Sequence, residues 1–240
     1  MRLYGKNPVF ERLKYNPRSI KKIYLQVGLS DAGYVYKKAK KWNIPIYAVP
    51  KTKIAKLARN LNTQGLVADV DAYEYLSYED LLEQTLKKKH ALVFLDGLND
   101  PQNLGAIIRS LACLGGFSLV LPSHDSVNIT ESVLHVACGG DNYVGIAKVA
   151  NLGQAIEQSK KKGFWIAGAV VKDGNNIFNE KLNFPLGIVI GSEQKGIRDA
   201  IRRRLDFPIT IPMSNHRLAM NVAHATAIFC YEVIRQKSRA

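Results

Sequence analysis

Three segments in the last two thirds of the sequence place polar side chains where a predicted strand is followed by a predicted helix. They are residues 100–109, residues 191–196 and residues 211–221. In open α/β sheets, ligands and catalytic groups gather at such strand-to-helix loops. The three segments therefore predict one site that is assembled from three loops far apart in the chain.

The first segment contributes Arg109 and Asn103. On a helix, Arg109 would lie about 140° around the axis from Leu104 and outside the apolar stripe, so packing does not require it. A guanidinium group in this place could hold a phosphate with two parallel hydrogen bonds, and the alternative is a surface arginine paired with a carboxylate. The side chain of Asn103 could reach into the site or could cap the helix.

The second segment contributes Glu193, which follows an apolar strand and precedes Gly196. Its carboxylate could orient Arg109, bind a nucleotide or balance a positive charge. The alternative is a glutamate at a helix start, which the helix dipole alone would favour.

The third segment supplies apolar candidates for the wall of a pocket, namely Ile211, Met213 and Met220. Apolar side chains with accessible backbone groups suit the ring of an adenosine, although the same residues could belong to the hydrophobic core. No Gly-x-Gly-x-x-Gly follows a predicted strand, so a Rossmann-type nucleotide-binding loop is disfavoured.

The net charge of +14 is concentrated in one quarter of the chain. Residues 1–60 hold 15 Lys or Arg against 2 Asp or Glu, a balance of +13, whereas the other 180 residues hold 19 against 18, a balance of +1. This asymmetry favours a polyanion-binding module joined to a nearly neutral domain. The alternative is a merely soluble basic surface.

The remaining composition is that of an ordinary globular protein. No segment approaches the roughly 20 apolar residues that a membrane span requires, and the start lacks the apolar core of a signal peptide, so we expect a cytoplasmic location. Cys113, Cys138 and Cys230 are far apart and include no Cys-x-x-Cys pair. We therefore expect reduced thiols and no metal site.

Hydrophobic periodicity predicts an N-terminal α/β domain at residues 1–73, a linker at 74–90 and a C-terminal domain at 91–240. In the first domain we expect strands at 22–27, 44–49 and 66–70 and helices at 31–42 and 52–61. Asn7 and Pro8 suit the N-cap and first position of an earlier helix. The linker should form a helix at 78–89, capped by Ser77 with Asp80 three residues on.

From residue 91 onward, strands and helices alternate strictly. Strands are expected at 91–96, 117–121, 143–146, 164–170, 186–190 and 207–211, which predicts a parallel sheet covered on both faces. A final helix at about 218–235 has so little polar surface that it must be buried nearly all round. Such a helix lies deep in the fold or packs against another subunit.

The three segments, in their order and spacing, resemble the signature motifs of the SpoU (TrmH-like) family of RNA ribose 2′-O-methyltransferases in the SPOUT superfamily. The resemblance covers about the whole length, because residues 4–9 and Gln64-Gly65 are similar to the RNA-binding domain of many members. It implies an α/β C-terminal domain with a deep trefoil knot, a homodimer formed through that domain, and a small N-terminal α/β domain that resembles a ribosomal protein and binds RNA.

The resemblance also implies two sets of site residues. The set expected to be catalytic is Asn103, Arg109, Glu193 and Asn221. The set expected to bind S-adenosylmethionine is Gly191, Ile211, Met213 and Met220.

The chain departs from the family pattern in the third segment. Members commonly have Gly at the position of Asn215 and Ser at that of Ala219. The lost hydroxyl removes one hydrogen-bonding group, for which His216 could compensate.

The expected function is therefore transfer of a methyl group from S-adenosylmethionine to a ribose 2′-hydroxyl of structured RNA, with ribosomal RNA favoured over transfer RNA. The alternative is a non-catalytic RNA-binding or ribosome-assembly protein that keeps the methyltransferase fold. A third possibility, a small-molecule enzyme, would leave the basic first domain unexplained. The expected partners are RNA and a second copy of the chain, without a membrane or a metal.

Overall fold

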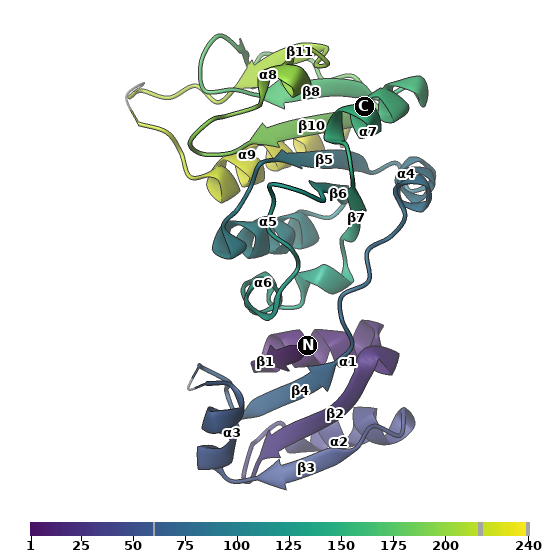
Figure 1. Cartoon of the computed structure of the whole chain (residues 1–240), viewed down its shortest axis with the longest axis vertical. Coiled ribbons are helices and arrows are strands. Elements are labelled where there is room, and N and C mark those ends of the chain that lie inside the picture. The colour runs from purple at the N-terminus through teal and green to yellow at the C-terminus, as the bar shows by residue number, and fades with distance from the viewer. Residues whose placement is uncertain (60, 216–217, 239–240) are drawn as a thin grey trace. The chain divides into compact units, whose positions relative to one another are not determined.

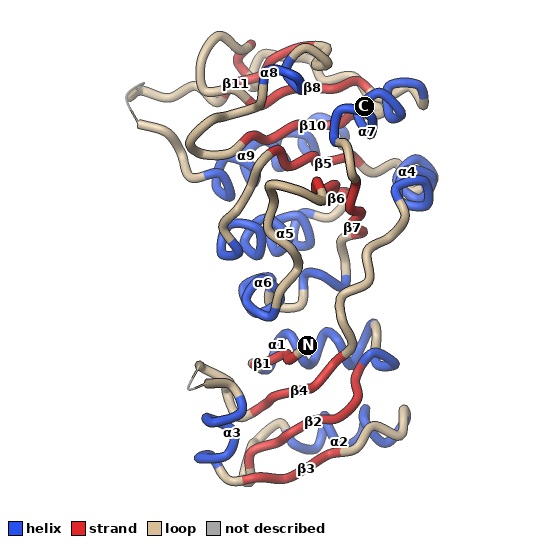
Figure 2. Tube along the Cα trace, viewed as in Figure 1, coloured by secondary structure: helices blue, strands red, loops and turns tan. Residues whose placement is uncertain are grey.

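The computed structural model describes residues 1–59, 61–215 and 218–238 (Figures 1 and 2). The chain forms two compact units, of which the first comprises Met1–Glu74 with Ile129–Tyr143 and the second comprises Tyr75–Asn128 with Val144–Ala240. Most of the expected linker thus lies in the second unit, and the first unit includes a segment of the expected C-terminal domain. As functional domains, the ranges 1–73, 74–90 and 91–240 stay a prediction.

The first unit contains a mixed four-stranded sheet with the order β1-β4-β2-β3. Its strands are β1 (Arg2–Tyr4), β2 (Ile20–Gln26), β3 (Ile46–Val49) and β4 (Leu66–Val70). Strand β2 runs parallel to β3 and antiparallel to β4, and β4 runs antiparallel to β1. The predicted bounds of β4 are confirmed, whereas β1 was not predicted because three residues are too few to show an alternating pattern.

Helices cover the two faces of this sheet unequally. They are α1 (Lys6–Tyr15), α2 (Ala32–Lys41) and α3 (Lys51–Leu57), with a short turn η1 (Pro17–Ser19). On one face Ile54 and Ala58 pack with Val49 and Val67. Because side chains alternate along a strand, the buried Ile23 lies on the other face, which α1 and α2 cover.

The start of α1 corrects a prediction. Its N-cap is Gly5, and Asn7 and Pro8 already lie inside the helix, so their expected placement as N-cap and first helical position is wrong. The Gly5 amide donates to the Leu66 carbonyl at 3.0 Å, and the Lys6 amide donates to Gln64 Oε1 at 2.9 Å. Contacts with the strand β4 region therefore set the start of this helix.

Two short helices from later in the chain complete the first unit, α6 (Glu131–Ala137) and η2 (Gly140–Asn142). Arg12 of α1 and Asp141 of η2 form an ion pair at 2.5 Å, with side chains only 6% and 2% exposed. The Tyr4 ring stacks on His135 with ring centroids 4.2 Å apart. These contacts assign residues 129–143 to the first unit, although they are more than fifty residues away in sequence.

The second unit contains a seven-stranded sheet with the order β7-β6-β5-β10-β8-β11-β9. All its strand pairings are parallel, as predicted. Its strands are β5 (Ala91–Asp96), β6 (Phe117–Pro122), β7 (Gly145–Val149), β8 (Trp165–Ala169), β9 (Asn175–Asn176), β10 (Leu186–Gly191) and β11 (Phe207–Thr210). Strands β5 and β10 are central, and buried apolar residues of both explain why the pattern predicted them well.

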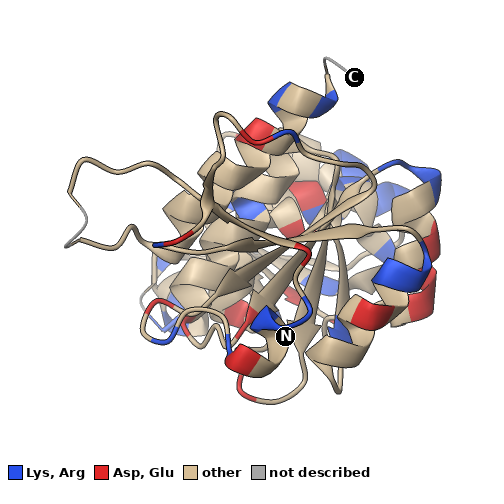
Figure 3. Cartoon of the chain, turned by 90° about the horizontal axis from the view of Figure 1, so that it is seen from above, with Lys and Arg blue, Asp and Glu red and all other residues tan. Residues whose placement is uncertain are grey.

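The helices of the second unit are α4 (Tyr78–Lys87), α5 (Pro101–Leu114), α7 (Leu152–Lys161), α8 (Asp199–Arg202) and α9 (Val222–Lys237). The predicted cap of α4 is confirmed, since the Ser77 side chain accepts from the Asp80 amide. Helix α8 begins three residues after Gly196, and α9 begins at Val222 rather than near 218, because Asn221 caps it. Basic and acidic residues lie side by side on the outer helices of this unit (Figure 3).

Helix α9 is less completely buried in one chain than its composition predicted. Phe229 and Val233 are buried, but Tyr231 is 62% exposed and His224 is also exposed. One side of the helix therefore faces away from the rest of its unit, although the helix packs closely against α5. Among the described residues, no helix is both long and apolar enough to cross a membrane.

Candidate functional site

Three of the four residues expected to be catalytic meet in one hydrogen-bond network. Asn103 lies on α5, Glu193 follows β10, and Asn221 precedes α9. Asn221 Nδ2 donates to Glu193 Oε1 at 2.8 Å and to Asn103 Oδ1 at 2.9 Å, and Asn103 Nδ2 donates to Glu193 Oε1 at 3.3 Å. The structure therefore brings the three sequence segments together.

The network lies where the topology of the sheet favours a site. Strands β5 and β10 are neighbours, but the chain leaves β5 toward β6 and β7 on one side and reaches β10 after forming β8 on the other. The loops after β5 and β10 diverge at such a place, which leaves a crevice at the carboxyl ends of the strands. Asn103 and Glu193 follow these two strands in the chain. Figure 1 shows β5 and β10 side by side in the sheet.

The geometry shows whether Asn103 caps its helix or reaches into the site. The N-cap of α5 is Asp100, whose carboxylate accepts from the Gln102 amide at 2.9 Å, and Pro101 occupies the first turn. Asn103 is therefore free of the capping role, and its 8% exposed side chain bonds to Glu193 and Asn221.

Asn221, in contrast, is a cap. Its Oδ1 accepts from the amides of Ala223 at 2.9 Å and His224 at 3.4 Å, which leaves Nδ2 free to donate to the other two network residues. A single asparagine thus fixes the start of α9 and the geometry of the network. This double use requires an amide, because a hydroxyl has only one proton to donate and an ionised carboxylate has none.

Glu193 does contact the start of a helix, as one alternative suggested. That helix is α9, and not α8, which follows Glu193 in the chain. Glu193 lies in the turn 193–195, before α8, and its Oε1 accepts from the Val222 amide at the start of α9 at 3.2 Å. Donors from three residues therefore converge on one carboxylate oxygen. The positive end of the α9 dipole adds to this stabilisation of the negative charge.

Gly191 has a steric role in holding the turn that carries Glu193. A Cβ atom built on Gly191 would lie 2.1 Å from the carbonyl carbon of Gly196 and 2.3 Å from the Ile197 nitrogen. Ser192 and Gly196 exchange two backbone hydrogen bonds, which close the turn, and Gly196 adopts a φ of +64°. Any side chain at 191 would push this turn away from the strand.

A cavity of about 410 Å³ adjoins the network in the second unit. All four residues expected to bind the cofactor line it, together with Glu193: Gly191, Ile211, Met213 and Met220. Phe229 and Val222 of α9 add apolar surface, and Lys172, Lys195 and Arg202 add positive charge. The cavity is within the size range of small-molecule sites and combines apolar walls with a few charged groups.

Among the described residues, Arg109 is the one expected site residue that belongs neither to the hydrogen-bond network nor to the wall of the cavity. It is exposed on α5, six residues beyond Asn103, and it is not among the described residues that line the cavity. Six residues advance a helix by about 9 Å and turn it by about 240°, so Arg109 points away from the direction of Asn103. The expected grouping of all four residues is therefore incomplete within one chain.

Sequence reasoning missed an ion pair that supports the site. Asp96, at the end of β5, has a fully buried side chain, and Arg198 lies after the turn that carries Glu193. Arg198 donates to Asp96 through its backbone amide at 2.8 Å and its Nε at 2.7 Å. An aspartate that ends an apolar strand was the available signal, but its partner lies 102 residues away.

One of the two departures from the family motif, Ala219, lies at the cavity. Ala219 lines it, so the position where members commonly have a serine does face the expected cofactor site. His216 lies outside the described residues.

No group of three or more His, Cys, Asp or Glu in the described part of the chain could hold a metal ion.

Comparison with known proteins identifies the family. A family model described as the SpoU rRNA methylase family matches residues 90–231, and one described as RNA 2′-O ribose methyltransferase substrate binding matches residues 2–76. The Bacillus subtilis protein YacO, whose name places it among TrmH family tRNA/rRNA methyltransferases, is 34% identical over 98% of this chain and 95% of its own length. The chain belongs to the SpoU rRNA methylase family.

Solved structures of SpoU proteins share the fold. The SpoU methyltransferase AviRb from Streptomyces viridochromogenes, in complex with AdoMet, matches with a TM-score of 0.82 and 19% identity over 100% of this chain and 91% of that one. The AdoMet-bound rRNA methyltransferase from Sinorhizobium meliloti matches with a TM-score of 0.81 and 19% identity over 98% and 86%. The expected SPOUT-type α/β fold is confirmed, and the trefoil knot stays a prediction.

Proposed function

We propose that this SpoU family member transfers a methyl group from S-adenosylmethionine to a ribose 2′-hydroxyl of structured RNA, with ribosomal RNA preferred over transfer RNA. We propose further that it acts in the cytoplasm as a homodimer formed through the second unit. The observation that carries the proposal is the network of Asn103, Glu193 and Asn221 beside a cavity lined by the four expected cofactor residues.

The walls of the cavity fit the cofactor chemically. Met213, Met220 and Phe229 offer the apolar contact that an adenine ring requires. The Glu193 carboxylate suits a positively charged sulfonium group, and Lys172 or Lys195 suits the carboxylate of the methionine portion. When bound, S-adenosylmethionine supplies an electrophilic methyl group.

The residues of the chain would then act mainly by orientation. Correct alignment of reacting groups can contribute roughly 7–11 kcal/mol to a reaction barrier. Asn103 and Asn221 hold Glu193 in one position, and Asn221 also ties it to the start of α9. We assign Glu193 and the two asparagines to the placement of the ribose, and Arg109 to the phosphate beside it.

The position of Arg109 supports a second copy of the chain as part of the site. Its guanidinium is exposed and does not line the cavity of its own chain, so a partner subunit would have to bring it to a cavity. The exposed side of α9, with Tyr231 and His224, offers an uncovered surface for such a partner. A symmetric dimer would use the same surface on both copies.

A non-catalytic RNA-binding or ribosome-assembly function is the second candidate. Ala219 favours it, because the residue lines the cavity without the hydroxyl that members commonly have there. The intact hydrogen-bond network argues against it, since a protein that only binds RNA has no evident need for three polar groups joined beside an apolar cavity. Calorimetry with S-adenosylmethionine separates the two, because absence of binding at millimolar concentration favours the second candidate.

The direct test is methylation of total RNA by the purified protein, followed by mass spectrometry of the nucleosides. We expect one or more new 2′-O-methylated nucleosides that require S-adenosylmethionine. A preparation that binds the cofactor but forms no such nucleoside on any RNA fraction would contradict the enzymatic proposal. Mapping of ribose methylation in cells with and without the gene would then identify the RNA.

A further inference from the structure

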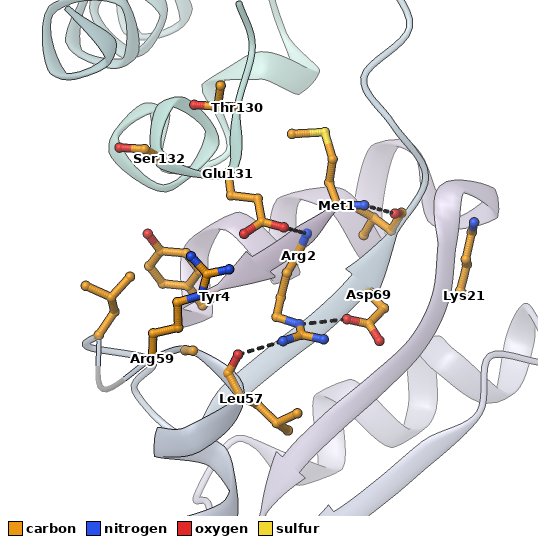
Figure 4. A pocket seen from close by; sticks show the side chains of 13 residues that line it. Met1, Arg2, Tyr4, Lys21, Leu57, Arg59, Asp69, Thr130, Glu131 and Ser132 are labelled. Atoms are coloured by element: carbon orange, nitrogen blue, oxygen red, sulfur yellow. Dashed lines mark hydrogen bonds and ion pairs between the residues drawn. The ribbon is translucent and has the colours of Figure 1, made fainter.

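The α3 side of the sheet in the first unit carries a second and larger cavity, of about 730 Å³ (Figure 4). Its walls come from β1, β4, the start of β2, the end of α3 with the residues that follow it, and the start of α6. The charged residues among them are Arg2, Lys21, Arg59, Asp69 and Glu131. Three basic groups thus face two acidic ones.

Arg2 is held firmly at the floor of this cavity. Its Nε donates to Asp69 Oδ1 at 2.9 Å, and its Nη1 donates to the Leu57 carbonyl at 2.7 Å, as Figure 4 shows. The other oxygen of Asp69 lies 3.5 Å from Lys22 Nζ. One carboxylate therefore lies between two cations, which leaves this row of the sheet with a net positive charge.

Aromatic rings continue the same face beyond Lys22. Lys22 Nζ lies 5.6 Å from the centre of the Tyr24 ring, and the Tyr24 and Tyr47 rings are 5.7 Å apart with planes inclined by 31°. Tyr24 and Tyr47 are register partners on β2 and β3, so their side chains lie on the same face of the sheet. Tyr47 is 51% exposed at the edge strand, and its ring is accessible to a flat ligand.

The contacts join the cavity and the rings into one continuous surface, from Arg2 through Asp69 and Lys22 to Tyr24 and Tyr47. Positive groups beside exposed tyrosine rings form the combination that binds single-stranded nucleic acids, because bases stack on the rings while cations contact phosphates. A paired base inside a duplex does not present its face to a protein ring. The surface therefore suits unpaired nucleotides.

We propose that this α3-side surface binds an unpaired stretch of the RNA substrate, with one base stacked on Tyr47 and a neighbouring nucleotide in the cavity against Arg2 and Arg59. The inference deepens the proposed function and rests on RNA as the substrate. Lys53 and Lys56, exposed on α3, add positive charge at the border of the same surface.

The opposite side of the first unit offers a matched control. Helix α2 also carries exposed aromatic and basic residues, including Tyr36, which is 47% exposed against 51% for Tyr47. Other rings on that side are already in contact with protein groups, since Tyr34 packs on Phe10 at 5.0 Å and Arg18 lies 5.7 Å from the Trp42 ring. Tyr36 is therefore similar in exposure but lies outside the proposed surface.

The experiment compares the full chain with its Tyr47→Ala and Tyr36→Ala variants in binding to a single-stranded RNA and to a duplex of the same sequence. We expect Tyr47→Ala to weaken single-stranded binding by at least about fivefold, since it removes the aromatic ring on which a base would stack. Tyr36→Ala should stay within about twofold of the unmodified chain, and duplex binding should change little in either variant. Equal losses in both variants, or no loss in Tyr47→Ala, would overturn the proposal.

Salt dependence gives a second readout that does not depend on stacking. Replacement of Lys22 by Gln should reduce the slope of log affinity against log salt by about 0.7 if this lysine contacts one phosphate of a single strand. An unchanged slope contradicts the proposed contact.

The methylation assay separates the proposed RNA surface from the proposed function. If the chain methylates RNA while Tyr47→Ala binds RNA normally, the surface alone is refuted. If the chain binds no RNA, both proposals are refuted.

Discussion

The two units differ in which feature of their sequence indicates what they do. In the first, basic and aromatic side chains lie on open surfaces, and an excess of Lys and Arg over residues 1–60 already indicates a polyanion. In the second, the charge is nearly balanced, and the important groups are a few polar side chains on three loops. Composition therefore reveals the binding unit, whereas only motif spacing reveals the candidate chemical site.

The units also differ in how their polar groups are held. The first contains a nearly fully buried ion pair, Arg12 with Asp141, between residues that are distant in sequence. The network of the second unit is partly exposed and joins loops at the ends of parallel strands. Damage to the first pair should therefore affect folding, while damage to the network should affect function.

The largest expected effect follows from removal of one partner of the buried pair. Burial raises the pKa of Asp141, against the opposing effect of the Arg12 charge. Arg12→Met should leave this carboxylate buried without its cation and cost about 3–5 kcal/mol of unfolding free energy. Hydrogen exchange resolved by residue should show the loss in amides of the first unit, while S-adenosylmethionine affinity remains near that of the unmodified chain.

Two further variants sharpen this test. Lys21→Met removes an exposed ion pair with Asp71, whose side chains are 64% and 48% exposed, and it should cost no more than about 1 kcal/mol. Combining Arg12→Met with Asp141→Leu should recover much of the loss, because no buried charge then remains. Equal destabilisation of both units by Arg12→Met would contradict their separate character.

The next largest effect concerns Arg109. Arg109→Ala should lower turnover by at least about a hundredfold, as expected for loss of a preorganised charge-stabilising group, and should leave dimer formation and cofactor affinity unchanged. Methyl transfer from radiolabelled cofactor to RNA measures the first quantity, and calorimetry measures the second. Near-normal turnover would show that the reaction takes place elsewhere.

A mixing experiment tests whether the arginine serves a partner chain. The Arg109→Ala and Glu193→Gln variants, each inactive alone, would form mixed dimers. In each mixed dimer, one site would combine an intact Glu193 from one chain with an intact Arg109 from the other. Turnover should recover to roughly a quarter of the unmodified value, because half of the dimers are mixed and each has one complete site. If both residues act within one chain, mixing should restore nothing.

How far the sequence predicted the molecule depended on whether the determining interaction was local. Strand β5 has the predicted bounds, and the Ser77 cap of α4 was predicted, because apolar runs and capping residues are properties of neighbouring positions. The start of α9 was placed four residues too early, since the apolar pattern begins at Leu218 but the asparagine cap decides where the helix starts.

Non-local pairings were beyond the sequence. Nothing near Asp141 indicates that its partner is Arg12, 129 residues away, so residues 129–143 were expected in the C-terminal domain. The relation between Asp96 and Arg198 was missed for the same reason. The motif resemblance did group Asn103, Glu193 and Asn221, but periodicity alone could not show that Arg109 points away from the cavity of its own chain.

A smaller effect is expected from Asn221→Asp. An aspartate can still accept from the Ala223 amide and cap α9, but it loses the donor and places a second carboxylate beside Glu193, where Nδ2 now lies 2.8 Å from Oε1. Repulsion between like charges should lower turnover roughly tenfold. Turnover of the unmodified chain and of the variant, measured under the same conditions, checks this.

The matched control is the N-cap of α7. Asn151 accepts from the Gln154 amide at 3.1 Å in a comparable cap. Asn151→Asp should therefore keep turnover within about twofold, because an aspartate caps a helix as well as an asparagine. Similar losses in both variants would mean that capping, rather than the network, explains the effect of Asn221→Asp.

The smallest effect decides whether α4 behaves as a linker or as part of the second unit. The Tyr78 hydroxyl donates to the Ala155 carbonyl at 2.7 Å and lies 2.6 Å from Ser159 Oγ, so it joins α4 to α7. Tyr78→Phe should cost about 1 kcal/mol of unfolding free energy, the usual net value of a hydrogen bond. A flexible linker helix would show no change.

The pH dependence of this variant gives an independent check. Burial raises the pKa of Tyr78 from 10.0 to about 12. The neutral phenol is therefore favoured in the folded state, so its contribution to stability is complete below pH 10 and is lost as the pH rises through about 12. The difference in unfolding free energy between the unmodified chain and Tyr78→Phe should narrow over this range, because the phenylalanine has no proton to release while other ionisations are common to both. If this difference in unfolding free energy stayed constant from pH 9 to pH 12, the Tyr78 hydroxyl would be accessible to water. Helix α4 would then not pack against α7 in the second unit.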